Sequence, residues 1–163
     1  MNEYLPNIIE NSIFDIDYEM LYKKNIRFLL YDLDNTITPS DQLLFDSKRK
    51  DLFDKIKKIG IKPIIFSNSP RKRVKKYAYK LNIDYVYLAC KPMSFKFIKV
   101  MKKYNFKKNE TAIIGDQLLT DIKGGNKVGI TTILVKPLVD YDSIFTRCNR
   151  IREKKIKKEL GID

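Results

Sequence analysis

Short apolar runs alternate with amphipathic stretches along most of this chain. The runs end in polar residues, as the buried strands of a parallel sheet do, and they lie at 28–31, 62–66, 84–88, 111–115 and 130–135. The stretches between them place apolar residues at helical spacing, at 46–59, 70–81, 94–104 and 118–127. This alternation predicts an α/β fold of the Rossmann-like kind, with a parallel five-stranded sheet and helices on both of its faces.

At 163 residues the chain fits a single domain, which we expect to span 1–163. Residues 1–25 are too apolar for a free tail. They should pack on the domain and include a short helix capped by Asp17, although an amphipathic foot that touches a membrane is an alternative. The core of the domain would then span 26–136, followed by a basic tail at 137–163.

The N-terminus and the hydropathy of the chain bear on its location. No run approaches the roughly 18 apolar residues of a membrane span. The first residues have neither the basic start nor the apolar segment of a secretion signal. We therefore expect a cytoplasmic protein.

Residue usage excludes several classes of site. The chain has no His, so it holds neither a His-containing zinc site nor a Ser-His-Asp or Cys-His hydrolase triad. Cys90 and Cys148 are too few for a disulfide framework, and we interpret both as structural thiols. Any acid or base catalysis must come from carboxylates, Lys or Tyr.

The net charge is +13, with 33 Lys and Arg against 20 Asp and Glu. Such an excess favours anionic partners: nucleic acid, an anionic membrane surface or phosphorylated substrates. Biased residue usage explains it equally well, so charge alone does not select a partner. The oligomeric state is not determined by the sequence.

Candidate chemistry begins directly after the first predicted strand, at Asp32, Asp34 and Thr36. Two carboxylates so close in sequence are tolerable at a strand end when a cation or a shared proton relieves their repulsion, and a divalent metal is the simplest solution. On its own this stretch also fits an ordinary polar turn.

Polar groups follow three further strands, and parallel strands would bring all four ends to one edge of the sheet. The further groups are Ser67 with Asn68, Lys91, and Asp116 with Asp121. Singly, such residues are helix caps, surface lysines or exposed helix positions. Four strand ends together are harder to explain as turns.

The order of these motifs resembles the haloacid dehalogenase (HAD) superfamily of phosphotransferases, over residues 28–135. The wording Asp-Leu-Asp-Asn-Thr, Ser-Asn, Lys-Pro-Met, Gly-Asp-Gln-Leu-Leu-Thr-Asp and Gly-Gly-Asn, with the tail Phe-Thr-Arg-Cys-Asn-Arg, is similar to the YqeG-type subgroup of subfamily IIIA. That subgroup is related to mitochondrial phosphatidylglycerophosphatases.

The resemblance implies a role for each residue. Asp32 would be the nucleophile that becomes an aspartyl-phosphate, and Asp34 would be the general acid and base. Mg²⁺ would be held by Asp32, Asp116 and the main-chain carbonyl of Asp34, with Asp121 completing the metal site directly or through water. The phosphoryl group would be bound by four residues: Thr36, Ser67, Asn68 and Lys91.

The lengths of the segments between the motifs bear on the substrate. Neither residues 37–45 nor residues 69–90 are long enough to hold a cap domain over the site. A capless site favours large phosphorylated substrates, and Arg71, Lys72 and Arg73 would form a basic rim suited to an anionic membrane. We therefore expect a phosphatase of phosphatidylglycerophosphate, bound peripherally to the inner face of a membrane. A phosphatase of nucleic-acid ends and a non-catalytic adaptor that binds nucleic acid or ribosomes are the alternatives.

The basic tail carries an imperfect apolar stripe that includes Ile144, Phe145, Cys148, Ile151 and Ile156. It could lie in a membrane interface. A solvated helix docked on the domain is the other interpretation.

Overall fold

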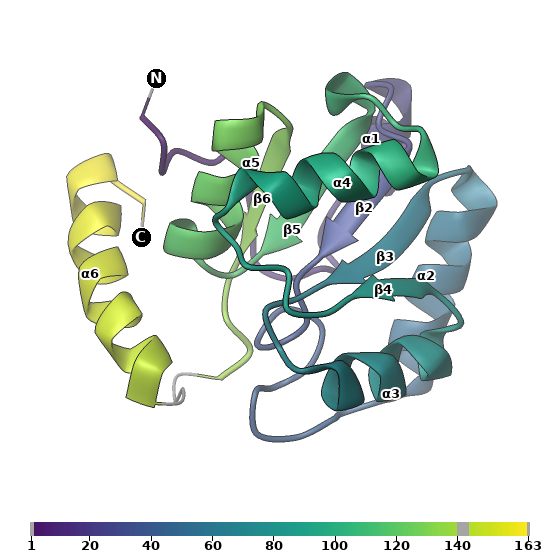
Figure 1. Cartoon of the computed structure of the whole chain (residues 1–163), viewed down its shortest axis with the longest axis horizontal. Helices are drawn as coiled ribbons and strands as arrows, with labels where there is room; N and C mark the ends of the chain where they lie inside the picture. The colour runs from purple at the N-terminus through teal and green to yellow at the C-terminus, as the bar shows by residue number, and fades with distance from the viewer. Residues whose placement is uncertain (1, 140–143, 163) are drawn as a thin grey trace.

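A computed structural model describes residues 2–139 and 144–162, with the backbone alone for 144–149. Six parallel strands form one sheet in the order β1-β6-β5-β2-β3-β4 (Figure 1). The strands are β1 (Ile8–Glu10), β2 (Phe28–Tyr31), β3 (Lys62–Phe66), β4 (Asp84–Val86), β5 (Thr111–Gly115) and β6 (Thr131–Val135). The helices are α1 (Tyr18–Lys23), α2 (Ser47–Ile59), α3 (Arg71–Leu81), α4 (Ser94–Tyr104), α5 (Lys123–Val128) and α6 (Ile144–Leu160), with a 3₁₀ turn at Lys108–Glu110 and a π-helix at Leu118–Ile122.

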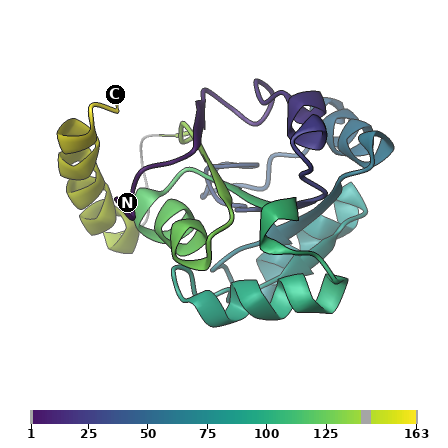
Figure 2. The same cartoon turned by 90° about the horizontal axis from the view of Figure 1, so that it is seen from above.

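The helices cover both faces of the sheet, as the alternating pattern predicts. Helices α1, α2 and α3 pack against the side chains of Leu29, Tyr31 and Ile114, while α4 and α5 pack against Phe28 and Leu30 on the other face. Figure 2 shows α1 and α2 on one side of the sheet and α4 and α5 on the other. Helix α6 lies beside α5 and the π-helix, outside these two layers (Figures 1 and 2).

The strand count is a correction, because the sheet has six strands rather than five. The additional strand is β1, which pairs with β6 so that Ile8 lies opposite Ile133. Reciprocal hydrogen bonds fix this edge: Asn7 N donates to the carbonyl of Thr132 at 3.0 Å, and Thr132 N donates to Asn7 Oδ1 at 2.8 Å. A three-residue strand held by such a distant contact has no periodicity of its own to reveal it.

Local signals placed most helix ends correctly. The Asp17 carboxylate caps α1 through Met20 N at 2.8 Å, and Asp46 caps α2. Gly60 ends α2 in a left-handed conformation with φ of 99°, which suits a residue without Cβ. The stretch predicted as one helix over 118–127 is instead a π-helix followed by α5.

Within the described residues, no helix is both long and apolar enough to cross a bilayer. Only loops and the elements named above separate β2 from α2 and β3 from β4. The core is therefore capless over these segments, as predicted.

Candidate active site

The register of the three central strands brings the predicted residues together. Tyr31 at the end of β2 lies opposite Ile65 of β3 and Ile114 of β5. The residues that follow these strands therefore emerge at one edge of the sheet, and Asp32 N still donates to the carbonyl of Ile114 at 2.9 Å. Ser67 follows β3 and is buried at this edge.

Three carboxylates converge at this edge. Asp32, Asp116 and Asp121 are all buried, and one carboxylate oxygen from each lies within 4.8 Å of the others. Gly115 makes this approach possible, because a Cβ on it would lie 2.2 Å from the Asp121 carboxylate. Three converging carboxylate oxygens are the donors that Mg²⁺ prefers, so these residues fit a divalent cation.

Lys91 is the cation at the centre of this cluster. Its buried Nζ donates to Asp32 Oδ1 and to Asp121 Oδ1, each at 2.6 Å. Burial opposes its charge, but the carboxylates of Asp121 and Asp32 outweigh that effect and raise the Lys91 pKa. Lys91 therefore remains charged beside the predicted nucleophile.

The three carboxylates carry more negative charge than their partners compensate. Burial raises the pKa of Asp32 to about 7 despite the opposing effect of Lys91. It likewise raises the pKa of Asp116 to about 7 against the effect of Arg150, and it raises the pKa of Asp121. A divalent cation would supply the missing positive charge, which is electrostatic support for the metal site.

Asn68 lies next to Lys91, where it holds the lysine backbone. Lys91 N donates to Asn68 Oδ1 at 2.8 Å, and Asn68 Nδ2 donates to the carbonyl of Lys91 at 3.2 Å. The Ser67 hydroxyl accepts a hydrogen bond from Ser69 N at 3.1 Å. Thr36 Oγ1 donates to Asp116 Oδ1 at 3.1 Å, so Thr36 supports a carboxylate of the cluster.

Asp34 stands apart from the three clustered carboxylates, and its side chain is held from another direction. Arg73 of α3 donates to Asp34 Oδ1 through Nε at 2.7 Å and forms an ion pair with the same oxygen through Nη2 at 2.6 Å. Ser69 Oγ donates to Asp34 Oδ2. The sequence placed Arg73 on the rim, but neither its contact with Asp34 nor the role of Ser69 had a recognisable signal.

The tail also reaches the site, which sequence reasoning missed. Arg150 of α6 forms an ion pair with Asp116 and donates through Nη1 to the Asp116 carbonyl at 3.2 Å. The buried carboxylate of Glu153 accepts from Leu119 N at 2.9 Å and forms an ion pair with Arg150 at 3.2 Å. The described part of α6 is thus docked on the domain, whereas the side chains of 144–149, including Cys148, lie outside the described residues.

Comparisons of the sequence with known proteins identify the family of this chain. Residues 88–137 match the HAD-hydrolase-like family. The Bacillus subtilis protein named probable phosphatase YqeG is 38% identical over 157 residues, which cover 96% of this chain and 91% of that protein. This chain belongs to the HAD-like hydrolases. The match to this probable phosphatase places the chain among the HAD-type phosphatases.

More distant similarities are found in sequence and in fold. Phosphatidylglycerophosphate phosphatase 1 of Arabidopsis thaliana is 26% identical over 143 residues, covering 82% of this chain but 41% of that longer protein. A subfamily III A hydrolase from Legionella pneumophila superposes with a TM-score of 0.55 at 21% identity, over 74% of this chain and 71% of that one. The 3-deoxy-D-manno-octulosonate 8-phosphate phosphatase of Moraxella catarrhalis, solved with magnesium and phosphate, gives 0.55 at 18% identity, over 88% and 97%.

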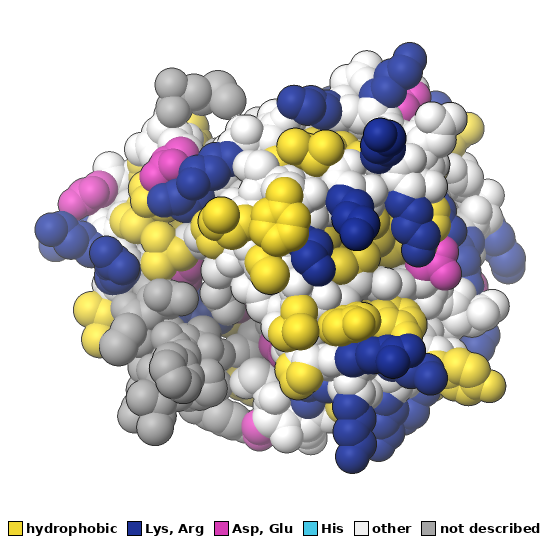
Figure 3. Space-filling model, in the orientation of Figure 1, with side chains coloured by type: hydrophobic (Ala, Val, Ile, Leu, Met, Phe, Trp, Pro, Cys, Tyr) yellow, Lys and Arg dark blue, Asp and Glu magenta, His cyan; other side chains and the backbone are white. Residues whose placement is uncertain are grey.

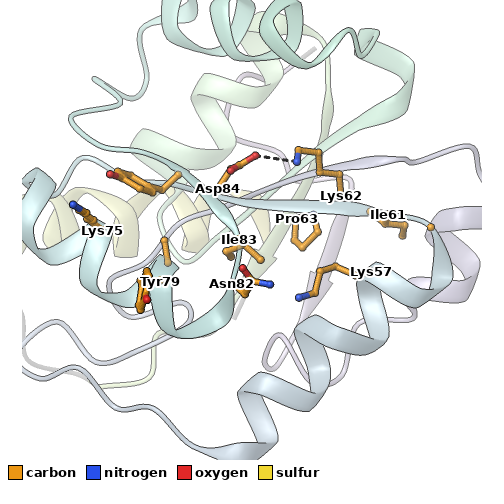
Figure 4. A pocket seen from close by; sticks show the side chains of 12 residues that line it. Lys57, Ile61, Lys62, Pro63, Lys75, Tyr79, Asn82, Ile83 and Asp84 are labelled. Carbon is orange, nitrogen blue, oxygen red and sulfur yellow. Dashed lines mark ion pairs between the residues drawn. The ribbon is translucent and has the colours of Figure 1, made fainter.

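A separate surface cleft of about 530 Å³ lies at the opposite ends of β3 and β4 (Figure 4). Its lining includes Lys57, Lys62, Lys75 and Asp84, of which Lys62 and Asp84 form an ion pair at 2.9 Å. None of the HAD motif residues lines this cleft. The candidate active site is therefore the carboxylate cluster at the carboxyl edge of the sheet.

Cys90 immediately precedes Lys91. It is exposed rather than packed in the core, and its thiol donates to the carbonyl of Leu88 at 3.1 Å.

Proposed function

We propose that this chain is a Mg²⁺-dependent phosphomonoester hydrolase that works through an aspartyl-phosphate on Asp32, and that it converts phosphatidylglycerophosphate to phosphatidylglycerol. The observation that carries the first part is the buried Asp32 carboxylate, held by Lys91 at 2.6 Å and grouped with Asp116 and Asp121. A buried carboxylate in contact with an ammonium group can meet a phosphate dianion only where further positive charge is available.

In the first step, an oxygen of Asp32 attacks phosphorus, and the bond between phosphorus and the leaving oxygen breaks. Asp34 gives its proton to that oxygen, so phosphatidylglycerol leaves neutral at the new hydroxyl. Arg73 and Ser69 hold the Asp34 side chain away from the three clustered carboxylates, which suits a residue that exchanges protons with the substrate.

In the second step, Asp34 takes a proton from water, and the water oxygen attacks phosphorus. The bond to Asp32 breaks, which releases inorganic phosphate and restores the carboxylate. Lys91 stays charged and neutralises the transferred phosphoryl group throughout. Mg²⁺ held by Asp32, Asp116, Asp121 and the main-chain carbonyl of Asp34 would supply the remaining positive charge.

Two observations support the lipid as substrate. The sequence is related to a protein named as a phosphatidylglycerophosphate phosphatase, and the capless core leaves the site open to a substrate fixed in a membrane. We accordingly propose a cytoplasmic protein that binds peripherally to the inner face of a membrane. A phosphorylated nucleic-acid end is disfavoured because the chain has no recognisable nucleic-acid module.

The test measures phosphate release from phosphatidylglycerophosphate in mixed micelles with Mg²⁺, beside a soluble phosphosugar, a phosphorylated oligonucleotide and the Asp32→Asn protein. We expect the lipid to be hydrolysed fastest and Asp32→Asn to be inactive. Turnover of another substrate alone would reject the lipid but retain the mechanism. If no substrate turns over, the non-catalytic adaptor becomes the better interpretation.

A further inference from the structure

Four large apolar side chains lie exposed between residues 88 and 98, in the segment that also carries Lys91 of the candidate site. Leu88 is 51% exposed, Met93 57%, Phe95 53% and Ile98 51%, and together we call these four residues the α4 surface. Isolated exposed apolar residues are ordinary, but several in one patch mark a contact site.

The α4 surface begins at the mouth of the candidate site. Leu88 and Met93 flank Lys91 in the loop between β4 and α4. Backbone hydrogen bonds fix that loop, because Leu88 N donates to the carbonyl of Ser69 at 3.2 Å and Met93 N to that of Cys90 at 2.8 Å. Leu88 also has a φ of 45°, a conformation that residues other than glycine rarely adopt.

The remainder of the surface lies on the outer side of α4. Phe95 and Ile98 are three residues apart and share a helix face with the exposed Lys99 and Lys102. The opposite face of the helix buries Phe97, and with it Val100 and Met101, against the sheet. Helix α4 is thus apolar on both sides, which packing within this domain does not require.

Positive charge surrounds these apolar side chains. Helix α4 carries four lysines and no acidic residue. The first turn of α3, beyond the site, carries Arg71, Lys72 and Arg73 and no acidic residue either. The Arg71 guanidinium lies 5.9 Å from the centre of the Tyr87 ring, which joins α3 to the loop that carries Leu88. Figure 3 shows hydrophobic side chains gathered across this face with Lys and Arg among them.

We propose that the α4 surface docks on an anionic lipid bilayer and presents the mouth of the active site to the membrane. The inference rests on the proposed lipid substrate and names the surface that would bring that substrate within reach. Apolar side chains flanked by cations, on a helix that has no acidic residue of its own, match an interface of acyl chains and anionic headgroups. A nucleic acid would match the lysines but would leave Leu88, Met93 and Ile98 without partners.

The experiment is flotation of the full chain with vesicles of phosphatidylcholine, with and without phosphatidylglycerol. We expect binding to the anionic vesicles, and a loss of about tenfold or more for Phe95→Ser/Ile98→Ser and for Lys99→Glu. The matched controls are Tyr79→Ser, an 85% exposed residue on α3, and Lys55→Glu, an exposed residue on α2. Both controls should bind as wild type does, and circular dichroism checks that every variant is folded.

Several results would overturn the proposal. The proposal is wrong if the wild-type protein does not float with anionic vesicles. It is also wrong if the α4 variants bind these vesicles as the control variants do. If the same variants keep vesicle binding but no longer bind a single-stranded oligonucleotide, the surface binds nucleic acid. If they keep vesicle binding but no longer self-associate, it binds a second copy of the chain.

The docking result is independent of catalysis because these vesicles contain no phosphomonoester. The Asp32→Asn protein should therefore bind them as wild type does. Docking without hydrolysis of phosphatidylglycerophosphate would reject the proposed substrate and retain the surface.

Discussion

Replacing Arg73 by Met tests whether this side chain positions Asp34 as the general acid. Met has a similar reach but donates no hydrogen bond. The substitution removes the contacts of Nε and Nη2 with Asp34 Oδ1, at 2.7 and 2.6 Å. Hydrogen bonds to a charged group contribute about 1.5–3 kcal/mol, which corresponds to a rate effect of about 10- to 150-fold. This is at or below the lower end of the contribution of about 10² to 10⁴ that general acid catalysis makes, as expected when Ser69 still holds the carboxylate.

The assay compares two esters that differ in their need for a proton. An alkyl phosphate has a poor leaving group and depends on protonation by Asp34, whereas p-nitrophenyl phosphate leaves readily without it. The second step, in which Asp34 activates water, is common to both esters, so the comparison uses kcat/KM, which reports formation of the aspartyl-phosphate alone. Arg73→Met should lower kcat/KM for the alkyl ester by the factor above and for the nitrophenyl ester far less. Lys72→Met, on the neighbouring exposed residue, is the matched control and should slow neither.

The contrast separates positioning from loop stability. Arg73 also donates to the carbonyls of Pro39 at 2.9 Å and Gln42 at 3.2 Å, so its loss could loosen the loop after β2. A loosened loop would slow both esters alike. Equal losses for the two esters, or no loss for either, would refute the assignment of Arg73 as a positioning residue.

Three further predictions concern the metal site and the core. Burial raises the pKa of Asp32 and Asp116 to about 7, so between about pH 4 and 7 the metal-free folded protein binds more protons than the unfolded chain. These two groups therefore make the stability of the folded protein fall as pH rises. Thermal unfolding in EDTA across this range should show the trend, and Mg²⁺ should reverse it. Gly115→Ala would place a Cβ 2.2 Å from Asp121, so we expect the Mg²⁺ requirement in a phosphatase titration to rise sharply, and unchanged affinity would contradict the geometry. Phe97→Ala empties a fully buried position and should cost about 3–5 kcal/mol in urea unfolding, where a loss below 1 kcal/mol would be inconsistent with its packing.

Sequence periodicity predicted the central sheet because each of its strands is an apolar run between amphipathic helices. It missed β1, since three residues carry no pattern and the pairing depends on Asn7 meeting Thr132 across the fold. It also missed the π-helix at Leu118–Ile122, in which Asp121 N and Ile122 N both donate to the carbonyl of Gln117, at 3.1 and 3.2 Å. An apolar pattern with helical spacing does not distinguish that extra residue per turn from an ordinary helix.

The residues of the candidate site likewise fall into some that the sequence identified and others that it did not. Its strand-end residues were identifiable because parallel strands deliver whatever follows them to one edge, and the structure brings Asp32, Lys91, Asp116 and Asp121 together there. The supporting residues had no such signal. Arg150 is a basic residue in a basic tail, and only the docking of α6 gives it Asp116 as a partner.

The charge of the candidate site is opposite in sign to the net charge of the chain. This contrast bears on how a substrate would enter. The chain carries a net charge of +13, yet its site buries three carboxylates against one lysine and one arginine, and Glu153 shares that arginine. Under the proposed function the basic exterior would attract an anionic lipid, but a phosphate dianion at the mouth would meet net negative charge within. A divalent cation would resolve the conflict by cancelling this negative charge where phosphorus must approach Asp32. The metal would thus determine whether the attraction of the surface leads to chemistry or only to binding.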